Sequence, residues 1–397
     1  MDVDMFIAEC QKLIPFVTSD SPGSFPVLLT NKTMETSLHK HFSGLNDPRI
    51  KRNKKHLLLD IVILTIIAVI CGAESWDSVE LFGKTKIDFL KTFLKLPNGI
   101  PSHDTINRVF SMLNPKKFEK LFAQWAASLK DKGIDLELIA IDGKTVRGSK
   151  DTFHGQPPVH LVNAWAGHNG LVLGQCKSEG KSNEITTIPL LLELLDVQGC
   201  IVTIDAMGTQ TKIAKGIVNG QGDYILALKG NQKGLQEETE SIFRVQKPTS
   251  TSEVTEKGHG RIETRKCEVI NDLDFLHGKE RWEGLSSIVR ITTERIVRDK
   301  TEHETRYYIS SMDTTAEQFN QHIRMHWGVE NSLHWTLDMT FGEDSQRKRN
   351  GMAAQNFSLV NKIALNILKK DSSKGSLKPK RLKAGWDNKF LLKLITN

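Results

Sequence analysis

Two aspartates in this 397-residue chain follow short apolar runs in the same way. Asp142 closes the run 138-LIAI-141, Asp205 closes the run 201-IVTI-204, and small residues follow both. A carboxylate beside a buried strand is costly unless something compensates its charge. Carboxylate oxygens are the ligands that Mg²⁺ and Mn²⁺ prefer. One such aspartate would be read as the cap of its turn, but the matched pair predicts a metal site where neighbouring strands end.

A third acidic ligand is expected on a helix predicted at 316–338. Residues at helical spacing form one stripe that is expected to be buried: Phe319, Ile323, His326, Glu330, Leu333 and Leu337. Glu330 belongs to this stripe and would face the sheet. Asp338 would lie about 80° around the helix and about 12 Å along it, and Glu343 and Asp344 follow Gly342, beyond the helix. Glu330 is therefore the predicted third ligand.

A zinc site is the alternative for the same helix. His326 and His334 flank Glu330 at four residues on either side and could form a His-Glu-His ridge. No HExxH motif accompanies them, so the carboxylate site is favoured.

The elements that would position these residues predict an α/β fold. Helices are expected between residues 55 and 130, and short apolar runs that alternate with helices follow from residue 137. The expected strands are 137–142, 159–167, 170–178, 200–205 and 223–230, and the expected helices are 183–196, 209–219 and 352–370. Strands that alternate with helices in this way predict a mixed sheet flanked by helices.

A β-rich insertion is expected at about 235–312. A polar helix at 235–245 precedes three alternating strands, at 259–271, 286–298 and 305–312, which would extend the sheet or form a lobe beside it. The expected division is a peripheral arm at 1–50, a helical domain at 51–133, the α/β domain at 134–370 with this insertion, and a basic C-terminal tail at 371–397.

The distribution of charge favours a polyanionic partner. Lys and Arg outnumber Asp and Glu by 54 to 47, a net charge of +7. Basic residues gather at 51–55, at 347–349 and at 369–393, where nine Lys or Arg stand. A Pro/Gly turn and a helix at 97–113, with Ser102 as the expected N-cap, resemble a helix-turn-helix that could contact DNA.

Two other features bear on location. The five cysteines are scattered without a CxxC pair and the N-terminus lacks signal-peptide features, which predicts a reducing cytoplasm. In 56-HLLLDIVILTIIAVICGAES-75, Asp60 leaves 13 apolar or small residues from Ile61 to Ala73, too few for a bilayer, so a buried core helix is expected.

Taken in order, several motifs resemble those of the H-repeat-associated family of insertion-sequence transposases, over residues 50–370. They are IDGKT, TTIPLLLELLD, TIDAMGTQ, DYILALKGNQ, SEVTEKGHGRIETR, RYYISS and HWGVENSLHWTLDMTFGED. The resemblance implies a ribonuclease-H-like domain with a DDE triad, preceded by an associated helical domain. By motif position the triad falls on Asp142, Asp205 and Glu330, at spacings of 63 (205 − 142) and 125 (330 − 205).

The activity implied by the resemblance is metal-dependent DNA cleavage and strand transfer, with two Mg²⁺ or Mn²⁺ ions. Double-stranded DNA, at the element ends and at the target, would be the partner, bound by a homodimer or higher multimer at the bacterial nucleoid, with no membrane. Further DNA contacts are expected at Lys144, Arg147, Lys229, Asn231, Gln232, His259, Arg261 and Arg324. Two alternatives remain open: an inactive DNA-binding relic, and another nuclease with this fold.

The sequence departs from the broader superfamily around the glutamate. That superfamily carries a Tyr, Arg, Glu, Lys signature, whereas Ile323 and His326 occupy the Tyr and Arg places and Leu337 the Lys place. Arg324 and Asp338 lie close enough in sequence to substitute for these helpers.

Overall fold

The computed structural model describes residues 35–50, 54–131, 136–258, 260–298 and 300–396. The N-terminal helices of this part of the chain are α2 (Ser37–Phe42), α3 (Leu58–Ile70), α4 (Trp76–Thr85), α5 (Ile87–Leu90), α6 (His103–Met112) and α7 (Pro115–Ser128). The apolar segment predicted as a core helix is α3, which is buried except at Leu59. Asp60 is tolerated there because its Oδ2 accepts a hydrogen bond from the Leu96 N–H at 2.8 Å.

No helix among the described residues is both long and apolar enough to cross a membrane.

A nine-stranded mixed sheet forms the centre of the fold, in the order β3-β2-β1-β4-β5-β9-β8-β7-β6. Its first five strands are β1 (Leu138–Val146), β2 (Val159–Ala166), β3 (Leu171–Ser178), β4 (Ile201–Ile204) and β5 (Asp223–Leu228). β1, β4 and β5 are parallel, whereas β2 and β3 are antiparallel to their neighbours. This is the ribonuclease-H-like arrangement, and the predicted α/β class is confirmed.

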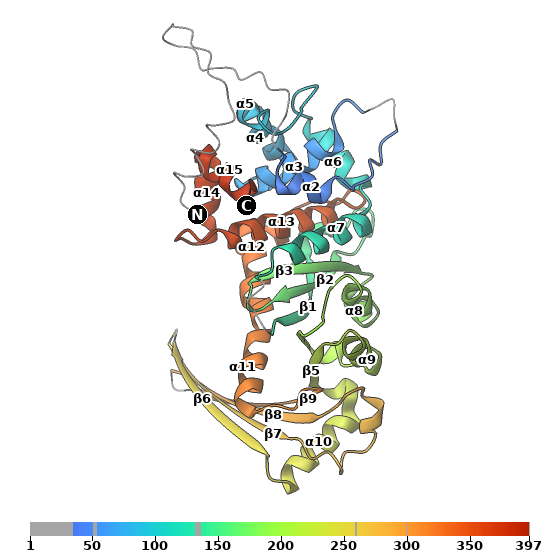
Figure 1. Ribbon diagram of the computed structural model, residues 1–397, viewed down its shortest axis with the longest axis vertical. Coiled ribbons are helices and arrows are strands. Elements are labelled where there is room, and N and C mark those ends of the chain that lie inside the picture. Colours follow the sequence, from blue (N-terminus) through green and yellow to red (C-terminus); the bar gives the residue numbers. More distant parts are fainter. Residues whose placement is uncertain (1–34, 51–53, 132–135, 259, 299, 397) are drawn as a thin grey trace, which may run out of the picture. The chain divides into compact units, whose positions relative to one another are not determined.

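The insertion extends this sheet instead of forming a separate lobe. It contains α10 (Lys233–Val245), β6 (Ser250–Gly258), β7 (Arg261–Ile270), β8 (Ser287–Val297) and β9 (Lys300–Ser310). β9 pairs antiparallel with β5, and the long curved strands of the insertion continue from there (Figure 1). β6 is one strand more than the sequence predicted. It was missed because it is a largely exposed edge strand that carries charged residues and has no apolar alternation.

Residues on alternate sides of β1 belong to two different cores. Leu138 and Ala140 pack with the helices α3, α7 and α13. Ile139 and Ile141 pack with α8 (Glu184–Leu192) and α9 (Thr211–Asn219), which cover the other face. Because side chains alternate along a strand, Asp142 points to the same face as Ala140.

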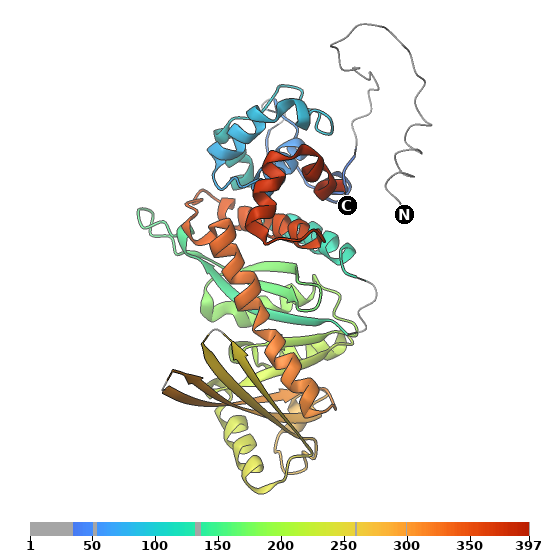
Figure 2. The same ribbon diagram turned by 90° about the vertical axis from the view of Figure 1, so that its left-hand side faces the viewer.

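One long helical region crosses that face. It consists of α11 (Ala316–His326), the π-helical segment Val329–His334 and α12 (Trp335–Phe341). Figure 2 shows it in orange, running from the insertion strands to the helical layer. α11 contacts β1, β4 and the insertion strands, the π segment contacts β1, and α12 contacts α13.

The predicted buried stripe is correct at Phe319, Ile323, Leu333 and Leu337 but wrong at Glu330. Phe319 and Ile323 are buried against the insertion strands. After the π segment, Leu333 and Leu337 are buried against the helical layer together with Val329 and Phe341, which the predicted stripe did not include. A π turn takes more residues than an α turn, so it rotates the buried row past Glu330, which is exposed.

The C-terminal helices belong to the helical layer. α13 (Ala353–Lys370) is buried along nearly its whole length and lies between the N-terminal helices and β3 (Figure 1). The segment 371–397, expected as a basic tail, contains α14 (Leu377–Trp386) and α15 (Asn388–Thr396), which pack on α3, α2 and α13. Buried apolar residues such as Leu391 and Leu394 anchor it, which a charge count does not reveal.

Candidate active site: three carboxylates around one pocket

Asp142 lies inside β1, where this strand loses its parallel neighbour. Parallel pairing with β4 ends at Ile141↔Ile204, whereas antiparallel pairing with β2 continues to Val146. The expectation that the strand ends at Asp142 is therefore wrong. β4 turns away at Asp205 while β2 keeps β1 extended, so the two aspartates stand where neighbouring strands separate.

Both aspartates cap their local backbone, as the simpler reading of each one expected. Oδ1 of Asp205 accepts hydrogen bonds from the N–H groups of Met207 at 3.1 Å and Gly208 at 3.4 Å. Oδ1 of Asp142 accepts from the Gly143 N–H at 2.8 Å. Each cap uses one oxygen, so a capping role leaves Oδ2 of each residue for other contacts.

Glu330 is brought to these aspartates by the π segment. Its side chain lines a pocket of about 150 Å³ together with Asp142 and Asp205. Lys229 and Arg306 also line this pocket, as does His326. Asp338, the competing carboxylate on the same helix, does not line it, so the structure brings together the three residues that the sequence singled out.

The three carboxylates form no ion pair with a lysine or arginine among the described residues. No Lys or Arg nitrogen of the described residues lies within the 4.0 Å ion-pair distance of Asp142, Asp205 or Glu330. Nδ1 of His334 lies 3.5 Å from Oδ2 of Asp142, but burial lowers the pKa of His334 to about 3, so its ring is neutral.

The pKa of Asp142 reflects its burial and its acidic neighbours. Burial, with a smaller contribution from the nearby carboxylates of Asp205 and Glu330, raises the pKa of the Asp142 carboxyl to about 7, against the lowering effect of the Gly143 hydrogen bond. A group of like charges with this effect favours binding of a cation.

The residues fit a hydrated divalent ion better than a closed metal cage. In the part of the chain that the structure describes, no three His, Cys, Asp or Glu side chains already surround a single point. Mg²⁺ is commonly held by one or two carboxylates and completes its shell with water and substrate phosphates. Three carboxylates around an open pocket match this chemistry.

The zinc ridge is not supported. Nδ1 of His326 lies 2.8 Å from Oγ1 of Thr203, and burial lowers the pKa of His326 to about 4. His334 instead faces Asp142. The π segment breaks the four-residue repeat on which the ridge depended.

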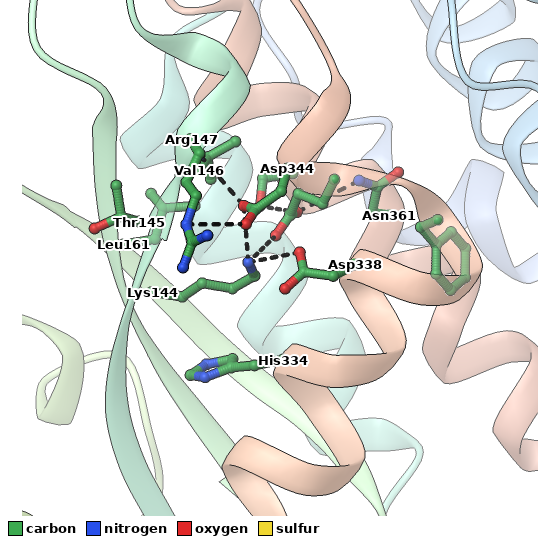
Figure 3. Close-up of polar contacts among 12 residues, drawn as sticks. Lys144, Thr145, Val146, Arg147, Leu161, His334, Asp338, Asp344 and Asn361 are labelled. Atoms are coloured by element: carbon green, nitrogen blue, oxygen red, sulfur yellow. Dashed lines mark hydrogen bonds and ion pairs between the residues drawn. The ribbon is translucent and has the colours of Figure 1, made fainter.

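Lys144 does not have the environment of a phosphate ligand (Figure 3). Its Nζ lies 2.7 Å from Oδ1 of Asp338, 3.1 Å from Oδ1 of Asp344 and 3.9 Å from Oε2 of Glu343. The expectation of a DNA contact is therefore replaced by an internal ion pair, since three carboxylates surround the ammonium. Arg147 is exposed, and its Nε lies 3.3 Å from Oδ2 of Asp344.

The expected contacts after β5 divide into two kinds. Lys229 is exposed and lines the pocket. Asn231 donates a hydrogen bond to the Ala206 carbonyl, and Gln232 donates to the Thr209 carbonyl at 2.9 Å. The two amides thus hold the loop that follows Asp205. His259 lies outside the described residues.

Arg261 and Arg324 line a second hollow, of about 290 Å³, on the insertion strands. This hollow shares Arg306, Trp327 and Glu330 with the carboxylate pocket, so the two adjoin. Three arginines that line it were not predicted from the sequence: Arg265, Arg295 and Arg306. Alternate positions on neighbouring strands share a face, and tracing that alternation along β7, β8 and β9 would have found them.

The turn and helix at 97–113, which the sequence suggested as a DNA contact, present acidic side chains that would repel phosphate. Ser102 caps α6, as predicted, by accepting from the Thr105 N–H. The next residue, His103, is bound by Glu80, whose Oε2 lies 2.7 Å from Nδ1, and it also lies 3.7 Å from the carboxylates of Asp77 and Asp104. The first turn of α6 is thus surrounded by acidic side chains.

Comparison with known proteins decides the family. The Transposase DDE domain matches residues 134–367, and the description DDE_Tnp_1-associated matches residues 39–126. An Escherichia coli K12 protein named "H repeat-associated putative transposase YhhI" is 43% identical over 371 residues, 90% of this chain and 97% of that protein. The chain belongs to the DDE transposase family.

Two further matches to this transposase chain are of different kinds, one a sequence relative and one a solved structure. An "Inactive transposase YbfQ" of the same strain is 51% identical over 74 residues, which is 19% of this chain and 88% of that protein. The solved synaptic complex of piggyBac transposase with hairpin DNA has a TM-score of 0.40 at 10% identity, and covers 87% of this chain and 75% of that one. A similarity of that size adds nothing to the fold assignment, which the sheet order carries.

The residues at the helper positions of the transposase signature are distributed over different environments. Ile323 and His326 line the carboxylate pocket, whereas Leu337 is fully buried. Arg324 lies 3.4 Å from Glu256 and lines the hollow on the insertion strands. Asp338, the other candidate substitute, is bound to Lys144.

Proposed function

We propose that this protein is an active transposase that cuts phosphodiester bonds at the ends of a DNA element and joins the freed ends to target DNA. Asp142, Asp205 and Glu330 would be the ligands of two Mg²⁺ or Mn²⁺ ions. The observation that carries the proposal is that these three carboxylates line one pocket without an ion pair to any described Lys or Arg. The geometry of this pocket is the support for catalysis over DNA binding alone.

The ions, when bound, would activate the attacking oxygen and stabilise the leaving oxygen of an in-line displacement. The chain supplies the positions of the ligands. The Gly143 N–H holds one oxygen of Asp142, and the Met207 and Gly208 N–H groups hold one oxygen of Asp205. Neutral His334 leaves the charge of Asp142 uncompensated.

The DNA backbone would approach over the insertion strands. The hollow lined by Arg261, Arg295 and Arg324 adjoins the pocket at Arg306, so arginines lie beside the carboxylates on this side. Arginine binds phosphate oxygens in a fixed fork geometry. Lys229, which follows β5 and lines the pocket, would add a contact to a DNA phosphate there.

A homodimer or higher multimer on paired DNA ends, working in the bacterial cytoplasm at the nucleoid, completes the proposal. It rests on the family alone, in which paired ends are processed together.

The test is cleavage of a linear DNA that carries the element's terminal inverted repeats, identified in the DNA that flanks the gene. With Mg²⁺, the purified chain should cut at the repeat and join the end to a supercoiled target, and Asp142→Asn should do neither. Asp338→Asn is the matched comparison, since it removes one charge from the same face of the fold and should still cut and join, though more slowly. Binding without cutting would instead indicate the inactive relic, and cutting without joining would indicate a nuclease.

A further inference from the structure

A second group of acidic side chains surrounds Lys144 of β1: Asp338 lies on α12, and Glu343 and Asp344 follow Gly342, just beyond this helix. Lys144 is two residues beyond Asp142 and points to the same face of β1. Its side chain is 7% exposed, and its Nζ is surrounded by Asp338, Glu343 and Asp344 (Figure 3). A buried lysine in this place links the strand that carries Asp142 to the helix that carries Glu330.

The strand and the helix run side by side in matching steps. Two strand residues rise about 6.6 Å, and four helix residues rise about 6 Å. Asp142 faces His334 at 3.5 Å, and Lys144 faces Asp338 at 2.7 Å, so one step along the strand corresponds to one turn of the helix. Two contacts in register fix both the height and the rotation of the helix relative to β1.

The π segment is the reason that the height and rotation of this helix must be restrained. Glu330 lies in the π-helical segment Val329–His334, in which the ordinary helical repeat is interrupted. Burial of Leu333 and Leu337 restrains the rotation of this region from the helical layer. On the opposite side, the ion pair of Lys144 with Asp338 is the shortest charged contact between β1 and this helix among the described residues.

We infer that Lys144 is a positioning residue, whose contact with Asp338 and Asp344 holds the Glu330 helix against β1 and so sets the geometry of the metal-binding carboxylates. The inference rests on the proposed function, because it assigns Lys144 a role in that same site. Lys144 itself touches neither the pocket nor its ligands.

A purely electrostatic role and a positioning role of Lys144 predict opposite changes in cation affinity when Lys144 is replaced, which makes the inference testable. Removing a positive charge near a cation site should tighten binding of the cation if charge alone matters. Removing a residue that orients the ligands should weaken it, typically by 10–100-fold, as for other outer contacts of metal ligands. A direct measurement of affinity therefore separates the two.

The experiment measures Mn²⁺ binding to the full chain from the electron paramagnetic resonance signal of free Mn²⁺, without DNA and without turnover. Lys144→Gln should bind Mn²⁺ about tenfold more weakly than the wild type. The double variant Lys144→Gln/Asp338→Asn removes the lysine together with its nearest carboxylate, which leaves less unpaired negative charge beside Glu343 and Asp344 than Lys144→Gln alone, and should show the same loss.

The matched control is Lys348→Gln. Lys348 is also 7% exposed, but its Nζ donates to the Glu74 carbonyl at 2.6 Å and contacts neither β1 nor α12 through an ion pair. This variant should keep wild-type Mn²⁺ affinity within about twofold even if its Tm falls.

Three results would overturn the inference. Lys144→Gln could bind Mn²⁺ as tightly as the wild type or more tightly, and if that variant does not fold, the double variant decides in its place. A loss of equal size in Lys348→Gln would show that general destabilisation is the cause. Failure of the proposed function has a different signature, in which the wild type and Asp142→Asn bind Mn²⁺ equally, and this would remove the site that Lys144 is inferred to position.

Discussion

Two groups of three carboxylates lie near β1 and the helical region that crosses it, one lining the pocket and one around Lys144, yet their partners differ. Asp338, Glu343 and Asp344 surround the ammonium of Lys144, and Glu343 also accepts hydrogen bonds from Ser358 and Asn361. Although burial lowers the pKa of Lys144, the three carboxylates raise it above its ordinary value, so this group contains its own cation. Asp142, Asp205 and Glu330 have no such partner among the described residues.

The two groups differ in whether the chain itself compensates their negative charge, and this suggests a structural role for one and a functional role for the other. A buried carboxylate is stable when hydrogen bonds or an opposite charge compensate it. The Lys144 group meets this condition within the chain and can act as a structural link. The pocket group forms no such ion pair among the described residues, and burial together with the acidic neighbours raises the pKa of Asp142. We propose that a cation from solution is the partner of these carboxylates, which is the reason to place catalysis in the pocket.

The largest expected effect is on cleavage. Asp142→Asn, Asp205→Asn or Glu330→Gln should reduce Mg²⁺-dependent cutting at least about a thousandfold, because metal ligation supplies several kcal/mol of transition-state stabilisation. Asp338→Asn should reduce it about tenfold, through the lost contact with Lys144. Gel-resolved cleavage rates under single-turnover conditions measure both, and an Asp338→Asn variant as inactive as Asp142→Asn would erase the distinction between the two groups.

Stability should respond to metal in one group only. At a free Mn²⁺ concentration of about 100 times Kd, binding to the folded chain should add about 2.7 kcal/mol and raise Tm by several degrees. Asp142→Asn should show no rise, whereas Asp344→Asn should keep it. Scanning calorimetry with and without Mn²⁺ measures the shift, and an equal rise in Asp142→Asn would place the ion elsewhere.

Glu119 on α7, a buried carboxyl outside both groups, sharpens the comparison because its hydrogen-bond partners are neutral amides. Its Oε1 accepts hydrogen bonds from Gln355 at 2.7 Å and Gln175 at 3.3 Å, and burial raises its pKa to about 7. A carboxyl with a raised pKa in the folded state stabilises the fold below its ordinary pKa, and this contribution is lost as pH rises through about 7.

Glu119→Gln should therefore remove a loss of stability that the wild type shows between pH 5 and pH 8. The difference in free energy of unfolding should move in favour of the variant by on the order of 1–3 kcal/mol over this range. Urea denaturation at a series of pH values measures it. Parallel curves for the two proteins would show that Glu119 does not titrate there.

The smallest expected effect concerns surface charge. Deleting residues 371–397 would remove packed helices, so single substitutions are the better test of the basic C-terminal segment. Lys383 and Lys389 are exposed. Each of Lys383→Gln and Lys389→Gln should lower the slope of log affinity against log salt by about 0.9 if that lysine contacts duplex DNA. An unchanged slope would leave these lysines as solvated surface.

The sequence was sufficient for those features that depend on local pattern. Short apolar runs located β1, β4 and β5, and the matched Asp142 and Asp205 marked where β1 and β4 separate. The prediction that Glu330 completes the group came from helical spacing, and Glu330 does line the same pocket, although for a different reason. Its role as a ligand stays a prediction.

What the sequence could not show depends on contacts between distant segments. The π segment has no distinctive residue pattern by which the sequence could predict it. The helix residues before it pack in one core and those after it in another. The partners of Lys144 lie about 200 residues away in the sequence. Without them, a lysine two residues after a candidate metal ligand suggests a phosphate contact. The edge strand β6 and the packed C-terminal helices were missed because exposure and charge hide them.

The most direct test of the central claim is anomalous scattering from crystals of the full chain soaked in Mn²⁺. We predict density for Mn²⁺ among the carboxylates of Asp142, Asp205 and Glu330, with two ions about 3.5–4 Å apart when DNA is bound, and none beside Asp338, Glu343 and Asp344. Density at the Lys144 group, or a pocket without Mn²⁺ at saturating concentration, would contradict the account.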